Sequence, residues 1–204
     1  MKFRSIAFCC AALICSMANA TTNASSLKLQ VYSVMLSTSP QCTSPVTVFS
    51  NATPTEVDFL VAPTLGSGNP PDGTYQCIIK MSDIIKFTPT SNDVFCQGGT
   101  EYTTEVCKST ESTQAPDAGA ATSCTTGADL VHLYLTTSRS GAVGGNAFLQ
   151  PLAPYDTSYG VKLTSPLVVS GTATAKFVVT AAGAVVGSLG SCDMNPPVFG
   201  FKIP

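Results

Sequence analysis

The stretch that decides the fold is residues 70–87, PPDGTYQCIIKMSDIIKF. It opens with two prolines followed by Asp72-Gly73, a combination that favours a tight turn because proline presets φ and glycine accepts a positive φ. Apolar and polar residues then alternate. We expect one face to carry Tyr75, Cys77, Ile79 and Met81, and the other to carry Gln76, Ile78, Lys80 and Ser82. The pattern predicts a long strand with one buried face and a cysteine on that face.

Shorter runs of the same kind occur along the rest of the chain, separated by turn residues, and no stretch has a long helical period. The expected strands are residues 27–36, 46–49, 56–61, 94–96, 102–107, 130–137, 161–169, 173–180, 184–186 and 198–203. Many short strands between turn signals predict an all-β protein, an antiparallel β-sandwich. The longest predicted loop is the Ser/Thr/Ala-rich segment 108–127.

The first twenty residues have the pattern of a signal peptide. Two basic residues precede an apolar run at 6–17, and Ala18-Asn19-Ala20 matches the small-x-small pattern that signal peptidase cuts. We therefore expect the mature chain to begin at Thr21. A lipoprotein signal at Cys15 is the alternative, but isoleucine precedes that cysteine where a small residue is expected. The prediction is an exported protein, which is periplasmic, on the cell surface or secreted.

Residues 21–204 have a length that suits a single β-sandwich domain. The late segment 163–186 is apolar, but it contains Pro166 and Lys176, so paired core strands explain it better than a membrane span. The net charge of the whole chain is −2 and no basic patch occurs, which argues against nucleic acid as a partner.

Cysteine usage predicts disulfides. Of nine cysteines, three lie in the predicted signal peptide, and the remaining six are Cys42, Cys77, Cys96, Cys107, Cys124 and Cys192. An even number in an exported chain predicts three bridges. If the strand at 75–87 turns back near 88–93, Cys77 lies nearest Cys107, which would leave Cys96 for Cys124 and Cys42 for Cys192. The other possible pairings stay open. A zinc site is disfavoured because no C-x-x-C occurs.

Two parts of the chain resemble a known group. Gly73-Thr74-Tyr75 with Ser82-Asp83-Ile84, and the later stretch 166–171 with 176–179, are similar to segments of poorly characterised exported bacterial proteins. Those proteins are thought to form prealbumin-like Greek-key sandwiches. The resemblance implies that fold and a cell-surface or periplasmic setting, and it implies no activity.

Catalytic signatures are weak. His132 is the only histidine, no G-x-S-x-G is present, and the carboxylates Asp72, Asp83, Asp156 and Asp193 are scattered. No D-x-D-x-D run suggests calcium. We therefore expect no enzyme, no cofactor and no metal, although a secreted hydrolase remains the least favoured alternative.

The leading functional hypothesis is a non-enzymatic protein that acts by binding or assembly, since sheet edges can pair with another chain. Its partner would be another protein chain, a surface glycan or a further copy of itself. The alternative is a carbohydrate- or peptide-binding module that uses loop 146–160, with Tyr155, Asp156 and Tyr159 as ligand-binding residues. The competing structural interpretation is that Phe148 and Tyr159 belong to the ends of core strands.

Overall fold

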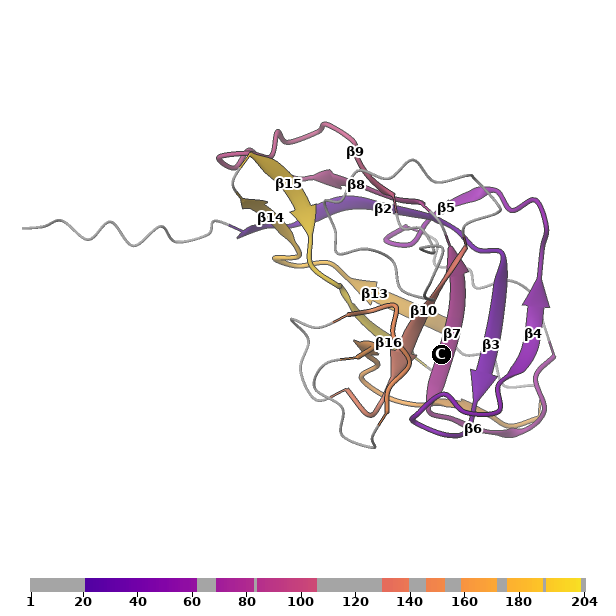
Figure 1. Cartoon of the computed structure of the whole chain (residues 1–204). Helices are drawn as coiled ribbons and strands as arrows, with labels where there is room; N and C mark the ends of the chain where they lie inside the picture. Colours follow the sequence, from indigo (N-terminus) through magenta and orange to yellow (C-terminus); the bar gives the residue numbers. More distant parts are fainter. Residues whose placement is uncertain are drawn as a thin grey trace, which may run out of the picture.

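The protein is all-β (Figure 1). The computed structural model describes residues 21–61, 69–82, 84–105, 130–139, 146–152, 159–171, 176–188 and 190–202, and these contain strands and no helix. The strands are β1 (Thr21–Thr22), β2 (Ala24–Gln30), β3 (Ser33–Ser37), β4 (Val46–Ser50), β5 (Glu56–Asp58), β6 (Gly73–Tyr75), β7 (Cys77–Ser82), β8 (Ile84–Pro89), β9 (Tyr102–Glu105), β10 (Val131–Thr136), β11 (Val161–Lys162), β12 (Leu167–Val169), β13 (Lys176–Thr180), β14 (Val185–Ser188), β15 (Ser191–Met194) and β16 (Val198–Lys202). The predicted signal peptide and the predicted loop 108–127 lie outside the described residues.

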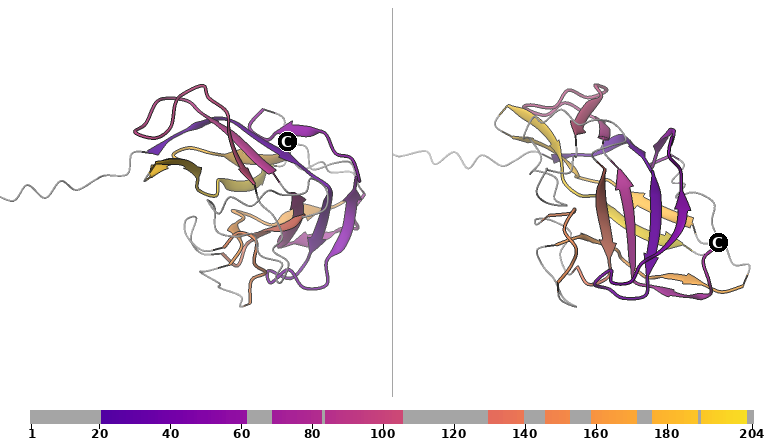
Figure 2. Two further views of the ribbon diagram at one scale, coloured as in Figure 1. Left: turned by 45° about the horizontal axis from the view of Figure 1, so that its top comes forward. Right: turned by 45° about the vertical axis from the view of Figure 1, so that its right-hand side comes forward.

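Two sheets provide most of the framework. One has the order β11-β10-β7-β3-β4, with β7 in the middle, and its strands stand side by side in the right-hand view of Figure 2. The other has the order β5-β2-β8-β9. All strand pairs within them are antiparallel except β10 with β11. Smaller sheets are β1-β14-β15, β12-β6 and β13-β16.

One bent ladder joins the two main sheets. Leu27 faces Phe87 and Leu29 faces Ile85 in the pair β2–β8, and Ser33 faces Met81 and Ser37 faces Cys77 in the pair β3–β7. The register passes through the bend without gaining or losing a residue. The strands predicted at 27–36 and 75–87 are therefore real partners that turn together from one sheet into the other, as strands do at the corner of an orthogonal packing. Figure 1 shows β2 and β8 crossing above the upright β3 and β7.

Three local predictions are wrong. Residues 94–96 form no strand but part of the turn between β8 and β9. Residues 191–194, where no strand was expected, form β15 and pair with β14. The single strand expected at 161–169 is instead two strands, β11 and β12, which pair with β10 and β6 respectively. Asp93 explains the first difference: its carboxylate accepts hydrogen bonds from the backbone N–H groups of Val94 and Gly187, at 2.6 and 3.2 Å, which holds the chain in a turn against β14.

The core lies between the sheets and includes Leu27, Leu29, Phe59, Phe87 and Leu135. Phe177 connects its parts, since its ring meets Phe59 edge-on at 6.2 Å and stacks on Phe199 at 5.7 Å. In β10 the predicted inward residues Val131, Leu133 and Leu135 are buried, but Tyr134 and Thr136 on the opposite face are buried as well.

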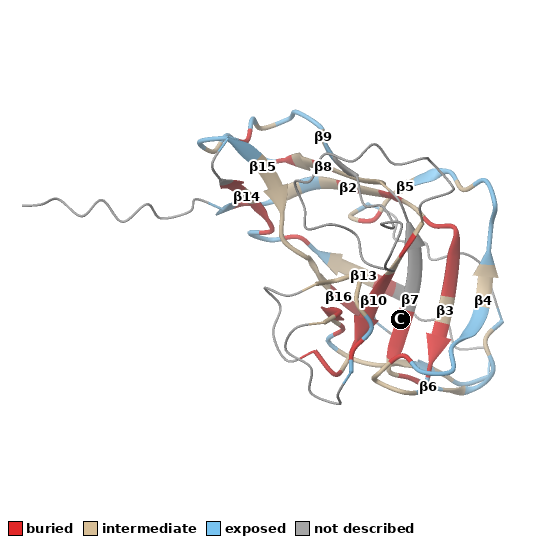
Figure 3. Cartoon of the chain, in the orientation of Figure 1, coloured by how far each residue is buried: buried red, intermediate tan, exposed pale blue. Residues whose placement is uncertain are grey.

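The one-sided burial predicted for β7 is wrong at its start. Cys77 and Ile78 are neighbours with opposite orientations, yet both are 0% exposed. Ile78 belongs to the main core, whereas Cys77 packs in a separate small cluster with Cys42 and Tyr134. A strand in the middle of a sheet is buried on both faces wherever a loop covers the second face, and here the disulfide ties the loop that carries Cys42 to that face. Figure 3 colours the beginning of β7 as buried.

The predicted disulfide pairing is also wrong. The structure joins Cys42 to Cys77 and Cys96 to Cys192. Cys77 cannot face the chain beyond β8, because β7 lies between β3 and β10 while β8 enters the other sheet beside β9. Cys107 and Cys124 lie outside the described residues, so the expectation of a third bridge remains a prediction.

Candidate functional site

The groups considered for catalysis have structural partners where the structure describes them. Asp72 accepts a hydrogen bond from Gly171 N at 3.0 Å, and Asp193 accepts one from Ser191 Oγ at 2.6 Å. His132, in β10, lies beside Tyr134 with ring centroids 5.9 Å apart, and burial raises the pKa of the Tyr134 hydroxyl. Asp83 and Asp156 are outside the described residues. In the described ranges no three His, Cys, Asp or Glu side chains gather where they could hold a metal ion.

Only the base of loop 146–160 is described. Tyr155 and Asp156 lie outside the described residues, whereas Tyr159 forms a parallel bridge with Asn146. The loop is closed there by Gly160 N, which donates to Asn146 O at 2.9 Å, and Asn146 Oδ1 accepts from Phe148 N at 2.9 Å. Phe148 packs against the core, as the structural interpretation of this aromatic residue expected. The structure therefore brings the two ends of the loop together, and it does not test the proposed ligand residues.

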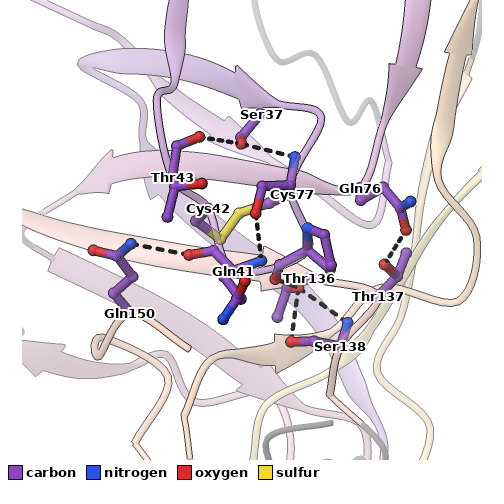
Figure 4. Close-up of a disulfide and its surroundings, with 12 residues drawn as sticks. Ser37, Gln41, Cys42, Thr43, Gln76, Cys77, Thr136, Thr137, Ser138 and Gln150 are labelled. Atoms are coloured by element: carbon purple, nitrogen blue, oxygen red, sulfur yellow. Dashed lines mark hydrogen bonds between the residues drawn. A yellow bond between two sulfur atoms is a disulfide. The ribbon is translucent and has the colours of Figure 1, made fainter. Parts of the chain in front are cut away.

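The most elaborate local arrangement surrounds the Cys42–Cys77 disulfide (Figure 4). Residues 39–43, which we call the entry loop because they lead to β4, are held at several points. Ser37 Oγ donates to Thr43 O at 2.6 Å, Gln150 Nε2 donates to Gln41 O at 2.9 Å, and the Thr136 hydroxyl donates to Pro40 O.

The backbone at and just after the entry loop has unusual dihedral angles. Cys42 and Ser44 have φ values of 59° and 49°, a left-handed region that residues other than glycine seldom occupy. Such conformations persist only where the surroundings determine them, and here the bridge to Cys77 and the three hydrogen bonds do so. The start of β4 is therefore fixed in place.

The strand β4 is an edge. It pairs with β3 on one side, and no other strand of the described chain pairs with its outer side. Val46 is 52% exposed, and Thr47 and Ser50 are exposed as well. Its far end is also held, because Asn51 N donates to Tyr32 O at 2.8 Å. A bulge at Val48 interrupts the register with β3 between Phe49 and Thr47.

This edge has an unusual charge pattern for an exposed strand. Residues 29–55 contain no charged side chain, so β4 lacks the lysines and carboxylates with which natural edge strands commonly prevent pairing. Sequence reasoning located a strand at 46–49 but did not single it out as an edge. The long uncharged interval around it was the available signal.

The outer face of the β5-β2-β8-β9 sheet, by contrast, carries several charged side chains. Lys28 and Lys86 face each other across β2 and β8, and each has a carboxylate partner at 2.6 Å, Glu101 and Glu56 respectively. These hydrogen-bonded carboxylates raise the pKa of both lysines, and the hydrogen bond from Lys28 lowers the pKa of Glu101. These four charges form two close ion pairs, so their charges cancel within the group.

Comparisons with family models, with curated proteins and with solved structures find no match to this chain. Within the described ranges there is also no helix with the length and apolar character that crossing a membrane requires. The functional argument therefore depends on the surfaces of the chain itself, and among the described edge strands β4 is the longest that carries no charged side chain.

Proposed function

We propose that this is an exported, non-enzymatic protein that acts by binding or assembly, and that it does so by pairing the outer edge of β4 with a strand of another chain. The observation that carries the proposal is an uncharged, exposed edge that is fixed at both ends. Pairing by strand addition draws its affinity from main-chain hydrogen bonds, and an edge that is already ordered loses little conformational freedom when a strand is added.

The compartment belongs to the same proposal. Two disulfides suit an oxidising environment, and the sequence of residues 1–20 suits export through a cleaved signal peptide. A prealbumin-like Greek-key sandwich as a single domain at 21–204 is the architecture that we propose for the exported chain. N-terminal sequencing that starts at Thr21 supports the leader, whereas acylated Cys15 contradicts it.

The experiment compares hydrogen exchange in two states of the protein, the assembled or partner-bound native fraction and the dilute purified chain. We expect amide protection to increase at residues 46–50 in the native fraction, because added strand hydrogen bonds slow exchange there. The uncharged strand β6 (Gly73–Tyr75) serves as the control. Equal exchange of β4 in both states would refute the proposal.

A second candidate is a carbohydrate- or peptide-binding loop at 146–160. The bridge between Asn146 and Tyr159 favours it, since a loop whose ends are held together can present its middle as a defined surface. In this candidate Tyr155 and Tyr159 would stack on a sugar and Asp156 would accept hydroxyl hydrogen bonds. Tyr155→Ala should then abolish signals on a glycan array without lowering the melting temperature, and an array without any signal excludes the sugar.

A further inference from the structure

We propose that the strand added to β4 is β4 of a second copy of this chain, paired antiparallel about a two-fold axis. This inference rests on the function proposed above and names its partner. The contact joins the two β11-β10-β7-β3-β4 sheets into one continuous sheet across the axis. Each copy contributes the same five residues, Val46–Ser50, so the interface is isologous and closes at two chains.

Charge selects this edge over the others. Strand β5 carries Glu56 and Asp58, β9 carries Glu105, β13 carries Lys176 and β15 carries Asp193. Among the described edge strands β4 is the longest without any charge. Two identical charged edges repel each other when they approach antiparallel, whereas two copies of β4 meet without any like-charge pair.

Charge also argues against a foreign partner. A surface that recognises a different protein usually has a complementary charge pattern, which speeds encounter and excludes wrong partners. The whole interval 29–55 offers none. What β4 presents instead is hydroxyl and β-branched side chains, with Val46 half exposed, and an identical strand complements these equally well.

The structure limits the strength of the contact. The strand has five residues, Pro45 precedes it, and the bulge at Val48 twists it, which is one of the devices that restrain edge pairing. We therefore expect a reversible dimer with a dissociation constant in the micromolar range.

The test is sedimentation equilibrium of the purified chain, disulfides intact, across the micromolar range. Thr47 is exposed and lies next to Val48, the middle residue of the edge, so Thr47→Lys places two like charges as diagonal neighbours close to the axis and should weaken the dimer at least about tenfold. The matched control is Thr74→Lys, which places the same charge on an exposed threonine of β6 and should leave the dimer unchanged. Thr47→Glu provides a second charged variant at the same position.

A charge-swap experiment tests the symmetry. Thr47→Lys and Thr47→Glu should each dimerise at least about tenfold more weakly alone and should form a mixed dimer when combined, because opposite charges then lie as diagonal neighbours close to the axis. Melting curves must show that every variant is folded as the unchanged chain is. A pair of variants that fails this check is replaced by Thr47→Arg with Thr47→Asp.

The remaining outcomes overturn the inference. A chain that stays monomeric at all concentrations, or a dimer that Thr47→Lys leaves intact, excludes pairing through β4 of a second copy. The unchanged chain could instead form oligomers larger than a dimer. If mixing the Thr47→Lys and Thr47→Glu variants then fails to restore association, β4 pairs with a different edge of the next copy. That result refutes the two-fold dimer, while the proposed function stands. The same holds if the purified chain is a monomer but the amides of β4 are protected from hydrogen exchange in the native fraction.

Discussion

Replacing Cys42 and Cys77 together by alanine should lower the free energy of unfolding by about 4 to 5 kcal/mol. The bridge joins positions separated by 35 residues, for which loop-closure entropy gives about 3.8 kcal/mol. Both cysteines are buried, at 3% and 0% exposure, so the cavity left by their sulfur atoms adds roughly 1 kcal/mol. Such a loss is comparable with the whole stability of many domains.

The second bridge is the internal comparison. Cys96 and Cys192 are separated by 96 residues, and the same relation gives about 4.7 kcal/mol. Here only Cys96 is fully buried, so the cavity contribution is smaller. The longer closed loop and the smaller cavity offset each other, and we expect the two double variants to agree within about 1 kcal/mol.

The assay is urea unfolding followed by circular dichroism, since the chain contains no tryptophan. Peptide mapping without reduction must show the untouched bridge in each variant. A loss below about 1 kcal/mol for either variant would refute the entropy argument. A map that joins Cys42 to Cys192 would refute the pairing itself. Loss of the Cys42–Cys77 bridge should also weaken the β4 dimer, because the entry loop is then held by hydrogen bonds alone.

Four further predictions concern individual sites of the fold. Changing Glu56 and Glu101 together to glutamine leaves two lysines facing each other, so the melting temperature should fall, and more at low salt than at high salt. In the unchanged chain the lowered pKa of Glu101 stabilises the fold above pH 4.5, and this contribution disappears as the pH falls further. The raised pKa values of Lys28 and Lys86 stabilise the fold below pH 10.5, and this contribution disappears at higher pH. Unfolding curves measured across pH check both effects. Gly187→Ala should destabilise by about 1 to 3 kcal/mol, because a Cβ there lies 2.7 Å from Asp93 Oδ2, whereas Gly73→Ala, with no contact closer than 3.6 Å, should be nearly neutral in the same melting assay. Ile78→Asp should prevent folding because it buries an unpaired carboxylate, and a cooperative unfolding curve for that variant would contradict burial on both faces of β7.

Local alternation predicted the separate strands but not their pairing. The runs at 27–36 and 75–87 form the ladder that connects the two main sheets, and their register is continuous through the bend. The bend itself could not be read from the sequence, since alternation reports which side chains share a face and not where the sheet turns. The closure of loop 146–160 could not be predicted from the sequence either. Its residue types suggested sugar binding, but the loop is closed by a bridge between Asn146 and Tyr159, which lie thirteen positions apart.

The sequence by itself determined the all-β class, the positions of most strands and the inward face of β10, because these follow from the order of apolar and polar residues over a few positions. Only the tertiary structure decided the disulfide pairing, the burial of Ile78 and the edge position of β4. Each of these depends on which strands become neighbours: Cys42 meets Cys77 because β7 lies beside β3, and β4 is exposed because the sheet ends there. Contacts between distant parts of the chain are selected by the packing of the whole fold, so no local pattern around these residues contains them.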